Sequence, residues 1–294
     1  MRRSAFCDSG VMTEEPWRWD PSLYAGSASY YARGRVPYPA ELIDCLVGEL
    51  ALDGRGRLLD VGCGPGSLTI PLALHFEQVV GVDADQQMLA IGAQRAAAAG
   101  ASNIEWVHRR AEDLTVDAGP FRVVTLAQAF HWMDRERVAR LLREMLARDG
   151  VLVHVHAMTH QGIESTDALP YPRPPHRQID ALVKKFLGDP RRAGQGYCTV
   201  GTNDEVELGV EESAIYRAAG FPHVRRLNVP GSVVVRSDDQ VVASVFSLSY
   251  AAPHLFGDHA PEFEDELRAL LRRASPAGHF SEAMREINVD VWRA

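Results

Sequence analysis

Short apolar runs alternate along the first half of the chain with segments in which apolar residues recur every three or four positions. Such runs are typical of buried strands, and the longer spacing is typical of helices that pack on one face. Strands alternating with helices predict right-handed crossovers and a parallel sheet covered on both faces. The expected strands are 57–61, 78–82, 104–108, 122–127 and 151–156, and the expected helices are 39–50, 67–75, 85–99 and 135–147.

This rhythm breaks after the fifth expected strand. Residues 159–208 are rich in proline and glycine, with a short helix expected near 179–187, and a connection of this length is typical of a lid. The segments 211–219, 224–229, 238–274 and 285–292 are expected as a helix, a strand, two helices and a final strand. The whole pattern predicts an α/β fold: a Rossmann-like, seven-stranded, mostly parallel sheet with an antiparallel last strand, plus a mostly helical cap.

Composition narrows the class of ligand. The formal net charge of the 294 residues is −8 and no basic stripe is visible, so no nucleic-acid partner is expected. The four cysteines lie far apart without a C-x-x-C pair, which favours a reducing compartment. No apolar run has the about 20 residues of a membrane helix, and no signal-peptide core follows Arg2 and Arg3. We therefore expect a cytoplasmic protein with a small-molecule partner and no membrane contact; the oligomeric state stays open.

A glycine-rich turn follows the first expected strand, in the run DVGCGPG from Asp60 to Gly66. Glycines there let the backbone turn sharply and approach a ligand closely. The dinucleotide fingerprint is G-x-G-x-x-G, but here position 67 is serine and the third glycine comes one residue early. The leading Asp60 suits a ligand with a cationic amino group better than a pyrophosphate. The turn therefore favours S-adenosylmethionine over a nicotinamide cofactor.

Polar residues follow the next three strands as well. Asp83 ends the second strand about twenty residues after the turn, where a carboxylate can accept both ribose hydroxyls. The run HRRAEDL at 108–114 follows the third strand, and its backbone or an acidic side chain, Glu112 or Asp113, is placed to contact adenine. The run AQAFHW begins at Ala127 after the fourth strand and would lie beside the reactive sulfonium.

These pieces in order resemble the class I methyltransferases, in particular the trans-aconitate methyltransferase-like branch. The matching runs are LLDVGCGPGSLT, VVGVDAD, RRAEDL and AQAFHWMD, with YYARGRVPYP before them, so the resemblance covers roughly 24–156. It implies that the glycine loop and its leading Asp60 bind the methionine portion, that Asp83 binds the ribose and that RRAEDL flanks adenine. One departure is Arg110, where many members have aspartate, so Glu112 or Asp113 must supply any acidic contact to adenine.

The cofactor-binding candidates come from these motifs and from the N-terminal segment. Tyr30, Tyr31, Arg35 and Tyr38 are expected either as a cover over the cofactor or as an ordinary packed helix, and aromatic faces suit a sulfonium cation. The candidates for S-adenosylmethionine are Tyr31, Arg35, Asp60, Gly62, Cys63, Gly64, Gly66, Asp83, Ala84, Met88, Ala111, Glu112, Ala127, Gln128 and Ala129.

Methyl transfer from a sulfonium is an in-line displacement, for which the protein mainly supplies orientation and exclusion of water. His131 is the candidate catalytic base, because an imidazole can act near neutral pH; the alternative is that it only shapes the pocket. Trp132 is a candidate for substrate contact or for packing. The other candidate substrate residues are His156, Tyr171, Tyr197 and His254.

Three histidines near the fifth strand have the chemistry of metal ligands. His154 and His156 point to the same face of a strand, and His160 follows soon after. The alternative is one or two pocket histidines without a metal. Because the transfer needs no metal, none is assigned.

The expected function is transfer of a methyl group to an oxygen or nitrogen of a small metabolite. A carbon acceptor is the alternative within the class, and a nicotinamide-dependent oxidoreductase or a catalytically silent cofactor-binding protein are the alternatives outside it. The expected organisation is a lead-in and cofactor cover, a cofactor-binding core, a lid, a return to the core, a helical cap and a final core strand: 1–38, 39–158, 159–208, 209–237, 238–280 and 281–294.

Overall fold

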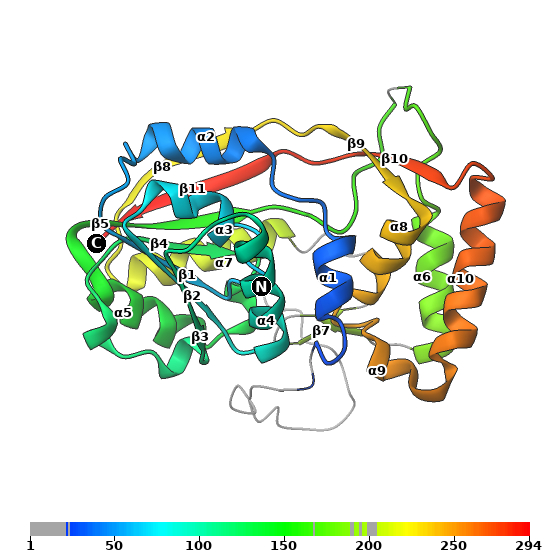
Figure 1. Cartoon of the computed structure of the whole chain (residues 1–294), viewed down its shortest axis with the longest axis horizontal. Helices are drawn as coiled ribbons and strands as arrows, with labels where there is room; N and C mark the ends of the chain where they lie inside the picture. Colours follow the sequence, from blue (N-terminus) through cyan, green and yellow to red (C-terminus); the bar gives the residue numbers. More distant parts are fainter. Residues whose placement is uncertain (1–21, 23, 167, 189–190, 194–195, 199–204) are drawn as a thin grey trace.

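In the computed structural model the protein has two lobes, a large sheet covered by helices and a smaller, mostly helical cap, with a short helix between them (Figure 1). The structure describes residues 22, 24–166, 168–188, 191–193, 196–198 and 205–294, with the side chains of 191–193, 196–198 and 205–211 left aside. Among the described residues, no helix combines the length and the apolar character that crossing a membrane requires.

Seven strands form the main sheet in the order β3-β2-β1-β4-β5-β11-β8. The first five of these are parallel, and β11 is antiparallel to both of its neighbours. The strands are β1 (Arg57–Val61), β2 (Gln78–Asp83), β3 (Ile104–His108), β4 (Phe121–Ala127), β5 (Leu146–His156), β8 (His223–Val229) and β11 (Ile287–Arg293). The predicted fold class, with its antiparallel last strand, is confirmed.

Successive side chains of a strand point to opposite faces of the sheet and pack in different clusters. Leu58 of β1 packs with helices α2 and α3 in one buried cluster, whereas its neighbour Leu59 packs with α5 and Tyr216 of α7 in another. This period of two is why a fully apolar run forms a strand buried on both faces. The covering helices are α2 (Ala40–Glu49), α3 (Thr69–Leu72), α4 (Gln86–Ala98), α5 (Arg135–Met145) and α7 (Glu205–Ala218).

The cap has a hydrophobic cluster of its own, formed mainly by α6, α8 and α10. Helix α1 joins it to the core: Gly34 packs so closely on α8 that an added Cβ would lie 2.2 Å from the backbone nitrogen of Ser244. The cap elements are α1 (Ala28–Gly34), α6 (His176–Leu187), β9 (Val233–Ser237), α8 (Asp238–Phe246), α9 (Pro253–Phe256), α10 (Ala260–Ala274) and β10 (His279–Ala283).

Several boundaries differ from the sequence expectation. Strand β5 begins at Leu146, five residues earlier than expected, because Leu146 pairs with Phe121 before a register shift. The expected helix 67–75 is one short α-helical turn followed by η1 (Ala73–His75). Strands β9 and β10 pair with each other outside the main sheet, and neither was expected. The remaining short elements are η2 (Ala111–Asp113), η3 (Val116–Ala118), η4 (Phe130–Trp132), β6 (Arg191–Ala193), β7 (Gly196–Cys198) and η5 (Gly257–His259).

Candidate functional site

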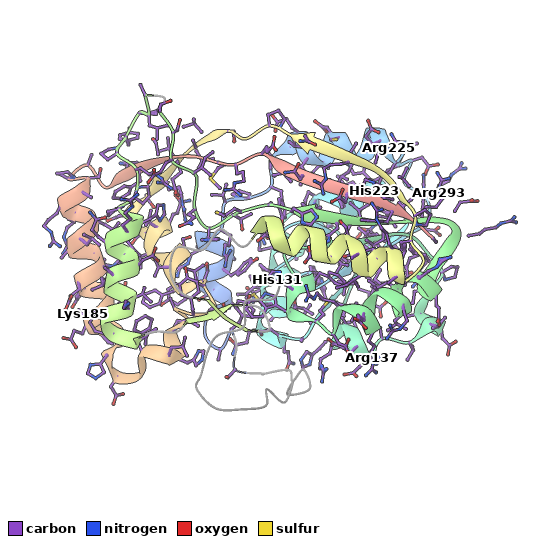
Figure 2. The ribbon with its side chains drawn as sticks, turned by 180° about the vertical axis from the view of Figure 1, so that it is seen from behind. His131, Arg137, Lys185, His223, Arg225 and Arg293 are labelled. Atoms are coloured by element: carbon purple, nitrogen blue, oxygen red, sulfur yellow. The ribbon has the colours of Figure 1, made fainter. Side chains whose placement is uncertain are left out.

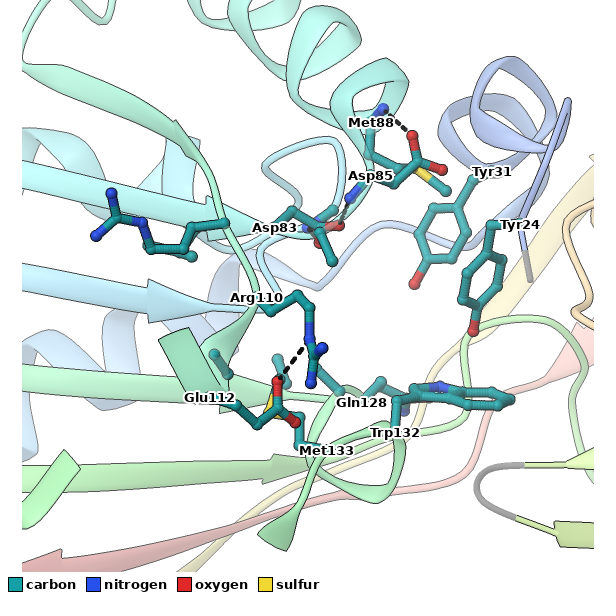
Figure 3. A pocket seen from close by; sticks show the side chains of 18 residues that line it. Tyr24, Tyr31, Asp83, Asp85, Met88, Arg110, Glu112, Gln128, Trp132 and Met133 are labelled. Atoms are coloured by element: carbon teal, nitrogen blue, oxygen red, sulfur yellow. Dashed lines mark hydrogen bonds and ion pairs between the residues drawn. The ribbon is translucent and has the colours of Figure 1, made fainter. Parts of the chain in front are cut away.

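A cavity, here called the main cavity, lies at the carboxyl ends of β1, β2 and β4, the edge where parallel α/β sheets bind ligands (Figure 3). Its empty volume is about 820 Å³ when the part open to solvent is included. All of the predicted cofactor residues line it except Arg35, Asp60, Cys63 and Gly66. The structure adds residues that sequence reasoning did not select for the cofactor: Tyr24, Val82, Asp85, Arg109, Arg110, Trp132 and Met133.

The glycine loop forms the floor of the main cavity and needs its glycines for two reasons. Gly62 has a φ of +69°, which a side chain rarely adopts. An added Cβ there would also lie 2.3 Å from the Cβ of Ala129 in the loop after β4. The amide groups of Gly62 and Cys63 donate to the carbonyl oxygen of Val82, so the loop is fixed to the end of β2. The glycine at position 62 therefore allows the loop after β4 to pack directly on the glycine loop.

Asp83 is the carboxylate at the centre of the main cavity. Its Oδ2 accepts a hydrogen bond from the amide of Gly64, and its Oδ1 accepts one from the amide of Asp85, both at 2.8 Å. Burial raises the pKa of Asp83 to about 6 despite these two hydrogen bonds. Each oxygen has a second lone pair, so the carboxylate is fixed and can accept two hydroxyl groups from a ligand.

Aromatic rings form the wall opposite Asp83. Tyr24 and Tyr31 come from the segment at α1, and the ring of Tyr24 meets that of Trp132 edge-on at 5.7 Å (Figure 3). Burial raises the pKa of Tyr24 well above its ordinary value, so the phenol stays neutral. Aromatic faces attract a cation placed against them, and the wall therefore suits the positively charged part of a ligand.

Arg110 and Glu112 form the far end of the main cavity. The Nε of Arg110 lies 3.4 Å from Oε2 of the buried Glu112, and Oε1 of Glu112 accepts a hydrogen bond from the amide of Asp134. Of the two acidic side chains that the sequence left open, Glu112 lines the cavity and Asp113 does not. The carboxylate of Glu112 is thus held by the guanidinium of Arg110 on one oxygen and by the amide of Asp134 on the other.

Gln128 ends β4 in a left-handed backbone conformation, with φ +59°. This conformation costs a residue with a side chain about 1 kcal/mol or more, and such strain persists where the surrounding structure holds it. It turns the chain so that Ala127, Gln128 and Ala129 all line the main cavity. The strained residue therefore shapes the cavity wall.

Comparison with known proteins adds to this geometry. Residues 58–150 match a family model described as a methyltransferase domain. An uncharacterised methyltransferase of Mycobacterium tuberculosis strain H37Rv is 40% identical over 131 residues, which are 43% of this chain and 50% of that protein. The crystal structure of a SAM-dependent methyltransferase from Geobacter sulfurreducens, solved with S-adenosyl-L-homocysteine, matches with a TM-score of 0.50 at 15% identity, over 93% of this chain and 98% of its own. Residues 58–150 of this chain are thus a methyltransferase domain.

The methyltransferase fold does not by itself decide the reaction. The crystal structure of the [4+2]-cyclase SpnF matches this chain equally well, with a TM-score of 0.50 at 18% identity over 92% of this chain and 96% of that one. The chain spans about half the length of the curated relatives it matches. The reaction that such a protein catalyses therefore depends on the side chains of its site and not on the fold alone.

Asp60 lies below the glycine loop of the methyltransferase domain and outside the cavity lining. Its Oδ2 accepts a hydrogen bond from the hydroxyl of Thr69 at 2.6 Å, and its Oδ1 accepts one from the hydroxyl of Thr125 at 2.8 Å. Burial raises the pKa of Asp60 above its ordinary value. The two threonines hold the carboxylate against α3 and β4, and its predicted contact with a ligand's amino group stays a prediction.

The other three predicted cofactor residues outside the lining support it from behind. Arg35 lies over the ring of Tyr31 at 4.7 Å and donates to the hydroxyl of Ser247, so its charge faces the cap. Cys63 is buried. A Cβ on Gly66 would lie 2.7 Å from the ring of Trp106, so this glycine allows helix and strand to pack closely rather than opening the cavity.

His131 lies in η4 and does not line the main cavity. Its ring is 5.0 Å from that of Trp132, which does line it. Burial, with the nearby Arg135 and Arg35, lowers the pKa of His131 to about 4. The imidazole is therefore a weak base at neutral pH, and the geometry favours the alternative in which it shapes the pocket.

The remaining candidate substrate residues are dispersed. Tyr171 stacks on His279 in the cap at 5.3 Å, and the ring of His254 forms a hydrogen bond with the carbonyl of Ala25. The side chain of Tyr197, in β7, lies outside the described residues. His156 faces acidic residues at the end of β5. Of the described residues predicted to contact substrate, Trp132 lines the main cavity, whereas His156, Tyr171 and His254 do not.

A second hollow, here called the side hollow, lies between α1, the glycine loop and the start of α8. Its polar lining includes three arginines and an acidic residue: Arg33, Arg35, Arg95 and Asp239. Tyr31 lines both hollows. The protein thus has a second, polar hollow that shares one aromatic residue with the main cavity.

Proposed function

We propose that this protein transfers a methyl group from S-adenosylmethionine to an oxygen or nitrogen atom of a small metabolite. The observation that carries the proposal is the half-buried carboxylate of Asp83, fixed by the amides of Gly64 and Asp85 beside the glycine loop. A carboxylate with a raised pKa gains stability when a ligand donates hydrogen bonds to it. The two ribose hydroxyls of the cofactor are donors of this kind.

The residues of the main cavity fit the rest of the cofactor. Gly64 lines the cavity, and a Cβ there would meet no protein atom within 4 Å, so the space beside the loop suits the methionine portion. Met88, Ala111 and Glu112 surround the place expected for adenine. The rings of Tyr24, Tyr31 and Trp132 are suited to a sulfonium. When bound, S-adenosylmethionine supplies an electrophilic methyl group and a good leaving group.

The protein's own contribution is orientation and exclusion of water. The aromatic wall at α1 covers the main cavity, and the strained Gln128 sets the path of the loop that carries Ala129 and Trp132. Holding two reactants in line can supply a large part of the rate enhancement without a protein base. We assign His131 to the support of this loop, since its pKa of about 4 leaves little basicity at neutral pH.

We place the acceptor in the side hollow, because Tyr31 lines both hollows. Ala32 lines the side hollow and not the main cavity. The substitution Ala32→Trp should therefore raise KM for the acceptor by about tenfold or more while the Kd for S-adenosylhomocysteine stays unchanged. An unchanged KM would place the acceptor elsewhere.

The proposed function is tested in two steps. Thermal unfolding with S-adenosylhomocysteine or with NADH should show stabilisation by the first compound alone; stabilisation by NADH alone would indicate the oxidoreductase alternative. Methyl-labelled S-adenosylmethionine is then incubated with a fractionated metabolite extract. Transfer of label supports the enzyme, and the labelled product reports an oxygen, nitrogen or carbon acceptor. Binding without transfer would indicate the silent cofactor-binding alternative.

A further inference from the structure

Two histidines and a glutamate meet on the α7 side of the sheet, outside both hollows. His154 and His156 lie two residues apart on β5, so their rings project from the same face of the strand. Glu212 of α7 lies over them. Its Oε2 is 3.8 Å from Nε2 of His154 and 3.8 Å from Nδ1 of His156. One oxygen and one nitrogen from each ring therefore converge on a single point.

The spacing of these atoms is close to that of metal ligands. Bonds of about 2.0–2.2 Å around a tetrahedral zinc ion place neighbouring ligand atoms roughly 3.4 Å apart. Within the described part of the chain, this is the one group of three or more histidine, cysteine or acidic residues whose ligand atoms all lie within 4.8 Å of one another. The two distances from Oε2 of Glu212, both 3.8 Å, are a few tenths of an ångström longer than this spacing.

The far side of each ring is also held, as in known metal sites. Nδ1 of His154 is hydrogen-bonded to the hydroxyl of Tyr216 at 3.1 Å, and Nε2 of His156 lies 3.2 Å from Oδ2 of Asp290. Metal-binding histidines usually donate their other N–H to such a partner, which fixes the ring and leaves the ligating nitrogen unprotonated. In both histidines, therefore, one ring nitrogen has a hydrogen-bonding partner, and the other nitrogen is available to bind a metal.

The carboxylate that holds His156 is itself anchored by cations. Arg226 donates to both oxygens of Asp290, at 2.9 and 2.6 Å, and His223 contacts Oδ1 at 2.8 Å. Both partners come from β8, and Asp290 comes from the neighbouring β11; the two strands lie beside α7 (Figure 2). The carboxylate of Asp290 is therefore fixed in place with its negative charge facing His156.

We propose that Nε2 of His154, Nδ1 of His156 and Oε2 of Glu212 bind a divalent transition-metal cation of the zinc type. Two imidazoles and one carboxylate are a donor set that suits such cations. His156 is 27% exposed, so one side of the site is open to solvent and leaves a fourth position for water. His160, which the sequence grouped with these histidines, lies instead against Arg35, with Nδ1 3.5 Å from Nη1.

The alternative is a network of hydrogen bonds that holds α7 on the sheet without a metal. The metal site and the metal-free network are distinguished by titrating tag-free, chelator-treated protein with Zn²⁺ in isothermal calorimetry. One equivalent should bind, and Glu212→Gln, which keeps the shape of the side chain, should weaken binding at least tenfold. His156→Gln, at a partly exposed position, should do the same, and His259→Gln, on an exposed histidine far from the cluster, should bind as the parent does.

Two further readouts keep the proposal open to refutation. Co²⁺ in place of Zn²⁺ should give the visible absorption of a tetrahedral site in the parent and lose it in the two ligand variants. Far-UV circular dichroism and thermal unfolding in chelator confirm that each variant is folded; if Glu212→Gln does not fold, His156→Gln decides. Absence of stoichiometric binding, or equal affinity in the parent and a folded ligand variant, would overturn the proposal.

Discussion

The pH dependence of cofactor binding follows from the position of Asp83. Its carboxylate is half-buried beside two amide donors, and its pKa is raised to about 6. The ionised form accepts hydroxyl groups, whereas the protonated form must donate its own hydrogen. Lowering the pH through about 6 therefore removes the form that binds the ribose. Affinity should be full above this pH and should fall below it.

The size of the effect can be worked out from the titration. With a pKa of about 6, about 97% of the group is ionised at pH ~7.5 and about 9% at pH ~5. If only the carboxylate binds, the affinity falls by roughly tenfold, or about 1.4 kcal/mol. Because the ligand's hydrogen bonds stabilise the charged form, binding lowers the pKa of Asp83 and releases a proton near pH 6.

Isothermal calorimetry with S-adenosylhomocysteine measures both quantities. The Kd is followed across this pH range, and titrations near pH 6 in buffers of different ionisation enthalpy report the protons released. Asp83→Asn serves as the control: it should bind more weakly at neutral pH and show no pH dependence over the same range. A parent protein with a flat profile, or a variant with the same slope as the parent, would refute the role given to this carboxylate.

Three further predictions concern the loop, the cap and the strained residue. Gly62→Ala should weaken S-adenosylhomocysteine binding at least tenfold in calorimetry, because its Cβ would lie 2.3 Å from the loop after β4; Gly54→Ala, which also has a positive φ but no atom nearby, is the control and should bind normally. Glu282→Gln should lower the free energy of unfolding in urea by about 3–5 kcal/mol, because it leaves the buried guanidinium of Arg236 without its carboxylate partner at 2.6 Å. A decrease of less than about 1 kcal/mol would contradict this. Gln128→Gly should raise the unfolding free energy by up to about 1 kcal/mol by relieving its φ of +59°, whereas Gln128→Ala should give no gain in the same assay.

The sequence predicted the core of the fold because the signals there are local. A buried strand such as 78–82 is apolar on both faces, and the helices between strands bury one side, so each element has its own period. The glycine turn and Asp83 lie directly at strand ends, and the carboxyl ends of parallel strands meet at one edge. Most cofactor candidates therefore met around one cavity.

Local patterns did not reveal where a side chain points when its partners are distant. Asp60 was expected to face the ligand, but it is held by Thr69 and by Thr125, a residue 65 positions away. Tyr24 lies in an irregular segment before the first expected helix, and only the folded chain brings it against Trp132. The signal that would have indicated it is an aromatic residue shortly before Tyr31, which is weak by itself.

The sequence by itself therefore determined the order of elements, the glycine turn and the acidic residue after the second strand, because each depends on neighbours within a few positions. Only the tertiary structure decided which distant segments meet. The two histidines of β5 were visible as a pair, but Glu212 joins them from 56 positions after His156, where α7 crosses the sheet. Packing of the helix on the sheet fixes such a contact, and a local pattern does not specify which residue of a helix will lie over which strand.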